Sequence, residues 1–119
     1  MTGISRQDAP AAIEGDGVEL RAREVGGGMT TAFVRAAKGV DLRPALKGLP
    51  EDLCQCPHWG YLLSGRLKMH TGDGAEIYEA GQSFYWGPGH APEALEDCEY
   101  VDFSPSRELA EVIGHLTGA

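Results

Sequence analysis

Basic residues are scarce in this chain of 119 residues. Ten lysines and arginines stand against eighteen aspartates and glutamates, which gives a formal net charge of -8 at pH 7. A protein with this balance is repelled by phosphate backbones and by anionic lipid headgroups. We therefore expect neither nucleic acid nor an acidic membrane as a partner.

Long hydrophobic runs are also lacking. No apolar stretch approaches the ~20 residues that a membrane-spanning helix requires. The first ten residues, MTGISRQDAP, lack the apolar centre of a signal peptide. With 42% hydrophobic and 24% charged residues, the composition is that of an ordinary globular domain and not of a disordered chain. The sequence predicts one soluble, cytoplasmic domain.

Cysteine is rare, and the three present are Cys54, Cys56 and Cys98. An odd number does not fit a disulfide framework. On an extended strand, residues two apart are separated by ~6.6 Å, whereas the Cβ atoms of a disulfide lie within ~4.5 Å of each other. We therefore expect these thiols to serve in packing or in metal ligation.

Segments of strand length lie between turn-forming residues, which include 17 glycines and 7 prolines spread along the chain. Residues 18–25 alternate apolar and polar side chains, and residues 29–36 are rich in β-branched and aromatic types. The intervening GGG predicts a hairpin. Further strands are expected within residues 59–71, 75–80, 81–86, 92–95 and 98–104.

The end of the chain departs from this pattern. Residues 104–116 offer Ser104 or Ser106 as an N-cap and place apolar side chains at helical spacing, so they predict one amphipathic helix at about residues 106–116. Residues 1–16 show no periodicity, which leaves a loose N-terminal arm or an added strand. Many short strands with one helix favour an all-β sandwich or barrel over residues 17–119.

Metal-ligating residue types occupy alternate positions in the middle of the chain, at Cys54, Cys56 and His58. Cys54 and His58 would be ~13 Å apart on an extended strand, so a single ion could reach both only across a bend, for which Pro57 is a candidate cause. His90 follows a GPG turn and could approach from a neighbouring strand. Cys56, His58 and His90 make the simplest three-ligand site, with Cys54 as a fourth ligand or a supporting residue. Buried packing of both thiols is the alternative.

Two glycine-containing stretches, YLLSGRL at 61–67 and AGQSFYWGPGHAP at 80–92, flank an acidic glycine turn. This pattern, which extends over about residues 41–105, resembles that of single-domain cupins. The resemblance implies a double-stranded β-helix, or jelly-roll, barrel, followed here by the C-terminal helix. It also implies a metal inside the barrel, bound through the motifs G-x5-H-x-H-x3-4-E-x6-G and G-x5-P-x-G-x2-H-x3-N.

The first cupin motif is altered in its ligands. If Gly65 is its closing glycine, His58 falls at the glutamate of the motif, Cys54 at the second histidine and Asp52 at the first. None of these positions keeps the ligand that the family has there.

The second motif keeps Gly81 and Gly89, but Gly87 replaces the first proline and Pro92 replaces the histidine. His90 lies two residues earlier and would share the face of Pro92 on a regular strand. The metal of the family therefore cannot be transferred to this chain.

The donor set itself favours soft or borderline metals. Two thiols and two imidazoles suit zinc or copper(I), whereas ferrous sites that activate oxygen prefer two histidines and a carboxylate. We therefore rank zinc first among divalent transition metals, copper or nickel next, and iron lower.

Besides an empty barrel that acts as a dimeric interaction protein, two functions remain open at this point. In the first, a metal-dependent enzyme of the isomerase, cyclase, decarboxylase or dioxygenase kind binds a small molecule in a pocket walled by Tyr61, Tyr85 and Trp86. In the second, a non-catalytic metal-binding or ligand-binding module contains a structural Cys/His zinc site. A homodimer is expected in either case, and the amino-terminal strands are natural candidates for its interface.

Overall fold

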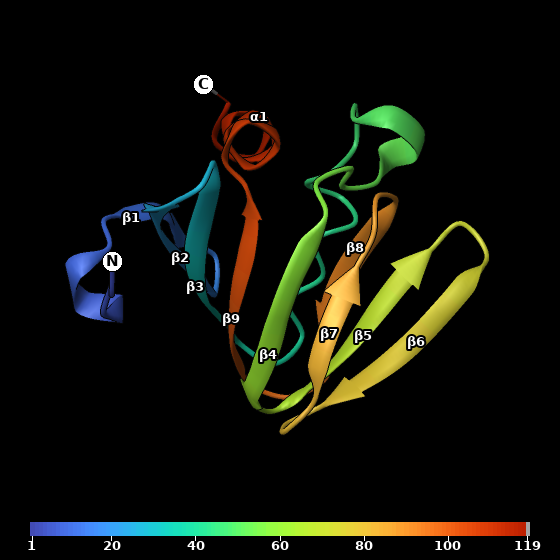
Figure 1. The fold of residues 1–119 in the computed structure, drawn as a ribbon. Coiled ribbons are helices and arrows are strands. Elements are labelled where there is room, and N and C mark those ends of the chain that lie inside the picture. The colour runs from blue at the N-terminus through green and yellow to red at the C-terminus, as the bar shows by residue number, and fades with distance from the viewer. Residues whose placement is uncertain (119) are drawn as a thin grey trace.

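The computed structural model describes residues 1–118 and contains two antiparallel β-sheets. One sheet has six strands in the order β1-β2-β3-β9-β4-β7, and the other has three in the order β6-β5-β8 (Figure 1). The strands are β1 (Ala11–Gly15), β2 (Val18–Gly26), β3 (Met29–Ala36), β4 (His58–Ser64), β5 (Arg66–Thr71), β6 (Gly74–Glu79), β7 (Ser83–Trp86), β8 (His90–Ala94) and β9 (Cys98–Pro105). The predicted all-β architecture is confirmed.

The hairpin predicted at the glycine triplet joins β2 to β3. Gly26, Gly27 and Gly28 all have positive φ angles, which residues with a Cβ atom rarely adopt. β3 then pairs with β9 over its whole length, from Met29 opposite Pro105 to Ala36 opposite Cys98. β3 and the last strand, β9, are therefore neighbours at the centre of the large sheet.

The C-terminal helix α1 (Ser106–Thr117) follows β9 directly and covers one end of the sheets (Figure 1). Its start differs from the expectation that Ser104 or Ser106 caps it. Pro105 occupies the N-cap position, and no side chain caps the helix there. Instead, the hydroxyl of Ser106 lies 2.7 Å from that of Thr30 on β3, which ties the first turn to the sheet. Gly118 ends the helix in a left-handed conformation.

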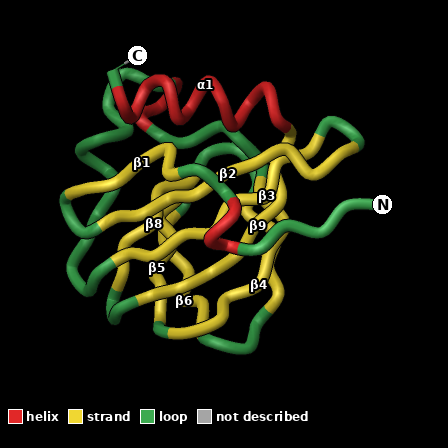
Figure 2. The backbone as a smooth tube through the Cα atoms, turned by 90° about the vertical axis from the view of Figure 1, so that its left-hand side faces the viewer, coloured by secondary structure: helices red, strands yellow, loops and turns green. Residues whose placement is uncertain are grey.

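The amino-terminal residues form a short 3-10 turn at Arg6–Asp8 and then the edge strand β1. Figure 2 shows β1 beside β2 and below α1, and β1 pairs with β2 from Ala11 opposite Arg21 to Gly15 opposite Val18. Of the two alternatives for this region, the structure contains the added strand.

The core consists of two clusters. The first lies between the sheets and includes Leu62, Leu67, Met69, Phe84 and Trp86. The second lies between α1, the segment before β4 and the strand β8; its buried members are Leu46, Cys54, Cys56, Ala91, Leu109 and Val112. None of the helices in residues 1–118 has both the length and the apolarity that crossing a membrane requires.

Candidate metal centre

Cys54, His58 and His90 come together although they belong to three different segments. Cys54 lies in the loop before β4, His58 is the first residue of β4, and His90 is the first residue of β8. The backbone N–H of Cys54 donates to the carbonyl of His90 at 2.8 Å, and the N–H of His90 donates to the carbonyl of Cys54 at 3.2 Å. This isolated bridge fixes the loop against β8.

The chain bends between Cys54 and His58, as one shared site requires. Residues 55–57 form no strand, and β4 begins only after Pro57. The Sγ atom of Cys54 consequently lies 3.8 Å from Nε2 of His58, far closer than the ~13 Å of an extended chain.

The three side chains form a compact ligand set. One ligand atom from each lies within 4.8 Å of the other two. Ligand atoms bound to one zinc ion at 2.0–2.3 Å are about 3.5 Å apart in a tetrahedron, so small side-chain movements suffice to close the set. Cys54, His58 and His90 could therefore hold a metal ion.

Hydrogen bonds at Nδ1 orient both imidazoles. Nδ1 of His90 lies 2.6 Å from the carbonyl of Gly87, and because a carbonyl only accepts, this nitrogen donates. Nδ1 of His58 lies 2.6 Å from the hydroxyl of Ser104, which itself donates to Asp102 at 3.4 Å. In both neutral rings Nε2 then carries the free lone pair. Histidine ligands of metals are commonly oriented in this way.

Burial keeps these groups uncharged. Desolvation lowers the pKa of His58 to about 3 and also lowers the pKa of His90. Desolvation raises the pKa of the Cys54 thiol to about 11. Both histidines are therefore ready to bind a cation at neutral pH, whereas Cys54 must first lose a proton, which a bound cation favours.

Asp102 and Ser104 were not predicted from the sequence as part of this site. Both are buried on β9 and reach His58 from behind, with Oδ2 of Asp102 3.8 Å from its Nδ1. Burial raises the pKa of Asp102 to about 7. The sequence did contain a signal, because Asp102 and Ser104 alternate in phase with the buried Cys98 and Tyr100.

Cys56 lies outside the ligand cluster. Its side chain is buried, and its Sγ atom lies 3.6 Å from the carbonyl of Pro57. The structure thus places Cys54 beside His58 and His90. In the simplest site predicted from the sequence, Cys56 had that place. Asp52, at the first ligand position of the cupin motif, is exposed and accepts a hydrogen bond from the N–H of Gly48 at 3.0 Å.

The three aromatic residues expected to wall a pocket have different surroundings. Trp86 is 3% exposed and lines the same inner space as His58 and His90. Tyr61 and Tyr85 are 44% and 55% exposed and occupy the outward-facing positions of β4 and β7. Tyr85 also borders an open hollow beside His90, whereas Tyr61 does not line the inner space.

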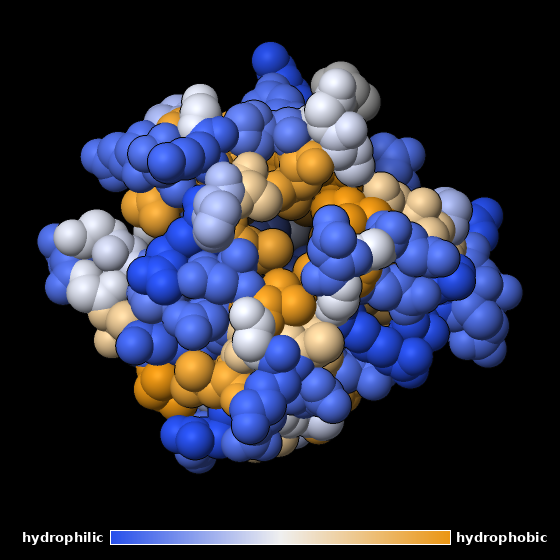
Figure 3. All heavy atoms as spheres, turned by 180° about the vertical axis from the view of Figure 1, so that it is seen from behind, coloured by the Kyte–Doolittle hydropathy of each residue, from blue (hydrophilic) through white to orange (hydrophobic). Residues whose placement is uncertain are grey.

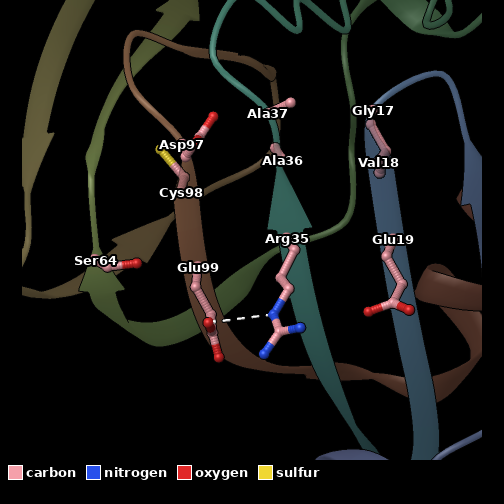
Figure 4. Close-up of a pocket in the computed structure, with 10 residues that line it drawn as sticks. All are labelled: Gly17, Val18, Glu19, Arg35, Ala36, Ala37, Ser64, Asp97, Cys98 and Glu99. Carbon is pink, nitrogen blue, oxygen red and sulfur yellow. Dashed lines mark hydrogen bonds and ion pairs between the residues drawn. The ribbon is translucent and has the colours of Figure 1, made fainter.

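A separate hollow of about 450 Å³ lies at the end of the large sheet away from α1. Figure 4 shows Arg35 and Glu99 reaching toward each other there from adjacent strands, and the two are joined by an ion pair of 3.2 Å. Cys98 lies at its edge, with Sγ 3.0 Å from the carbonyl of Arg66 and 3.1 Å from that of Glu96. Of the other charged residues in its lining, Glu19 lies 3.4 Å from Arg21, and Asp97 accepts from the backbone N–H of Lys38 at 2.8 Å. Its charged groups are thus all partnered, and the Cys98 thiol is engaged by backbone carbonyls.

Comparison with known proteins identifies the fold. Neither models of protein families nor curated proteins match the sequence. Among solved structures, an RmlC-like cupin from Shewanella frigidimarina matches with a TM-score of 0.62 and 15% identity, over 87% of this chain and 90% of that one. KdgF from a Halomonas species matches with a TM-score of 0.64 and 18% identity, over 89% and 96% of the two chains. Ectoine synthase from P. lautus matches with a TM-score of 0.65 and 12% identity, over 93% and 85%.

The glycine frame of the cupin motifs agrees with these matches. Gly65, Gly81 and Gly89 have φ angles of 88°, 93° and 95°, a region that favours glycine. His90 and Pro92 lie on one face of β8, opposite Thr71 and Met69 of β5, and both line the inner space. The resemblance seen in the sequence is thereby confirmed at the level of the fold, and the chain is a small cupin-fold protein.

Proposed function

We propose that this protein is a metal-dependent enzyme that acts on a small molecule inside the barrel, with Cys54, His58 and His90 as the metal ligands. The observation that carries this proposal is the number of ligands. Three protein ligands leave a position for substrate or water, whereas structural zinc sites have four. Bound there, a metal would supply Lewis-acid chemistry that polarises a carbonyl or lowers the pKa of a water molecule.

The protein residues have distinct parts in this proposal. His58 and His90 offer Nε2 because their Nδ1 atoms are held by Ser104 and by the carbonyl of Gly87. Asp102 is a positioning residue, since it accepts from Ser104, whose hydroxyl holds Nδ1 of His58. Trp86, Met69 and α1 exclude bulk water from the inner space. Zinc remains our first choice, before copper, nickel and iron, because the donors are one thiolate and two imidazoles.

Elemental analysis of untagged protein purified without chelators tests the ligand set. We expect about one equivalent of metal in the wild type and, in Cys54→Ser and His90→Gln, a reduction of about tenfold or more. Cys56→Ser and His115→Ala serve as matched controls that retain the metal, because Cys56 lies outside the cluster and His115 binds the carbonyl of Lys47 instead. Equal metal content in all five proteins would contradict the proposal.

Cobalt(II) substitution separates the enzyme from a structural site. Azide should change the visible spectrum of the cobalt protein if a coordination position is open. A spectrum unaffected by azide, together with metal loss in Cys56→Ser, would instead establish a closed Cys/Cys/His/His site and a non-catalytic binding module.

A further inference from the structure

The inner space beside the metal ligands continues into an apolar cleft. An enclosed space of about 60 Å³ is lined by all three ligand residues, and a cleft of about 300 Å³ lies next to it. Leu20, Val34, Leu42, Tyr100 and Leu116 line both spaces. Figure 3 shows hydrophobic residues gathered around a hollow in the face seen from behind.

The lining of both spaces is poor in hydrogen-bonding groups. Within the described residues 1–118, neither space is lined by a lysine or an arginine. The charged residues of the lining are Asp102, which accepts from Ser104, Asp41, which pairs with Arg43 at 2.7 Å, and Asp16 at the rim. A sugar or nucleotide placed here would leave several polar groups without partners, at a cost of about 1–3 kcal/mol for each.

A second hollow, of about 730 Å³, opens beside His90 and is polar, with Glu51, Asp73 and Glu76 in its lining. It is lined by only one of the three ligand residues, His90. The apolar cleft adjoins the space that all three share, and it is therefore the better route to the whole ligand set.

We propose that the ligand of this site has a single metal-binding polar head and an apolar tail, with the tail lying in the cleft of Ile13, Val18, Leu20, Leu42 and Leu116. This inference rests on the proposed metal site and adds the substrate class. The small inner space admits only a compact head, and the outer cleft has the size and apolar lining typical of pockets for small organic molecules.

A series of alkyl hydroxamates, from acetohydroxamate to octanohydroxamate, tests the tail. The hydroxamate head chelates transition metals, and calorimetry on the zinc-loaded protein gives the affinity of each member. Because each buried methylene contributes by its transfer from water, affinity should rise about fourfold per added methylene until the cleft is filled.

Two matched variants locate the tail. Ile13→Lys introduces a charge into the cleft from the edge strand β1, and Val18→Lys does so from β2. Each should abolish the rise in affinity with alkyl chain length. Ile77→Lys makes the same exchange on the edge strand β6, where the side chain is 44% exposed, and should leave the series unchanged. Circular dichroism establishes that each variant is folded.

The outcomes separate this inference from the proposed function. Affinity that is independent of chain length in a protein that binds acetohydroxamate would overturn the apolar tail and leave the metal site intact. Failure of every hydroxamate to bind protein with one equivalent of zinc would overturn the open coordination position itself. If affinity rises with chain length as steeply in Ile13→Lys and Val18→Lys as in the wild type, the assignment of the tail to this cleft would also be overturned.

The outer face of the six-stranded sheet carries a group of exposed large apolar side chains. Trp59, Tyr61 and Leu63 of β4, Tyr85 of β7 and Phe103 of β9 are between 41% and 55% exposed. Trp59 lies opposite both Phe103 and Tyr85, so these side chains share one face, and the rings of Trp59 and Tyr85 are 5.1 Å apart. We refer to these five residues as the aromatic face.

We infer that the aromatic face pairs with a second copy of this chain. Aromatic side chains present ~150–250 Å² each, so five large apolar side chains at about half exposure leave about 500 Å² of apolar surface. That is as large as the largest apolar patches of monomers, which are often functional, and it matches the apolar part of a stable interface of about 800 Å² per partner. A sheet face can pack on its own copy about a twofold axis.

Sedimentation velocity over a concentration series tests this pairing. We expect a dimer for the wild type and for Ile77→Lys, whose exposed isoleucine lies on the other sheet, and a monomer for Trp59→Lys and for Tyr85→Lys. A wild-type chain that stays monomeric throughout the series would overturn the inference. A dimer that survives both lysine substitutions would do so as well.

Discussion

His58 and Asp102 form a buried pair whose protonation is reversed relative to that of the unfolded chain. Desolvation lowers the pKa of His58 to about 3 and raises that of Asp102 to about 7. Near pH 5 the unfolded chain protonates the histidine and ionises the aspartate, whereas the folded chain does the opposite. The folded and the unfolded chain each bind one proton on this pair near pH 5. The contributions of His58 and Asp102 to the pH dependence of stability therefore offset each other.

Replacing Asp102 should therefore expose the pH dependence that His58 contributes. In Asp102→Asn, the unfolded chain still protonates His58 at pH 5 and the folded chain does not, so stability should fall with decreasing pH. Relative to wild type, we expect an additional loss of about 2 kcal/mol between pH 7 and pH 5. Urea unfolding of chelator-treated protein at both pH values measures it, and parallel pH curves for the two proteins would contradict the reversed protonation.

Among the three candidate ligands, only Cys54 should make the metal affinity depend on pH. Its thiol has a pKa raised to about 11 by burial and must lose one proton on binding, while both histidines are already neutral. Affinity should therefore fall about tenfold for each pH unit between about pH 8 and pH 6. Competition with a chelator of known affinity measures this slope. A hundredfold change per unit would show that a second thiol, such as Cys56, also ionises.

At the scale of the element, β4 depends on one glycine for its place in the sheet. A Cβ atom at Gly60 would lie 2.3 Å from the carbonyl oxygen of Val101 and 2.5 Å from the ring of Phe84. The strand can thus approach β9 and β7 closely only without a side chain at this position. His58, two residues earlier on the same strand, is positioned by that approach.

Gly60→Ala should accordingly destabilise the protein by about 1–3 kcal/mol, the usual cost of inserting a methyl group into a packed core. Gly72→Ala is the matched control, since a Cβ atom there meets no heavy atom within 4 Å. Thermal unfolding of the metal-free proteins compares the two. A Gly60→Ala protein as stable as Gly72→Ala would show that β4 can move away from its neighbours.

At the scale of the whole molecule, the three candidate metal ligands lie on a loop, on the large sheet and on the small sheet. His58 begins a strand of the six-stranded sheet, His90 begins one of the three-stranded sheet, and Cys54 precedes both in the chain. An ion at this junction would hold the two sheets together beneath α1. The unfolded chain offers no comparable arrangement of ligands.

Zinc should therefore raise the unfolding temperature of the protein. At a free zinc concentration 1,000 times the dissociation constant, stabilisation is about 4 kcal/mol by mass action. We expect the shift in differential scanning calorimetry for wild type and Cys56→Ser but not for Cys54→Ser. An equal shift in all three proteins would indicate that zinc binds elsewhere.

The sequence by itself determined the local structure of this protein. Strand alternation, the glycine triplet after β2 and the helical spacing in residues 106–116 depend on neighbours in the chain, and the structure has the strands and the helix at those places. The positive φ angles of Gly65, Gly81 and Gly89 belong to the same class, because a turn requires them whatever lies around it. These patterns predicted an all-β sandwich or barrel with one helix, and the resemblance of residues 41–105 to the cupin motifs added the cupin fold.

Only the tertiary structure decided which ligands meet and which aromatic residues face inward. The bend at residues 55–57 turns Cys54, and not Cys56, toward His58, because the backbone bridge to His90 holds the loop at that point. Strand register directs Tyr61 and Tyr85 outward and Trp86 inward, and it carries Ser104 to His58 across 46 residues of sequence. Such contacts depend on the pairing of distant strands, which local sequence patterns do not contain.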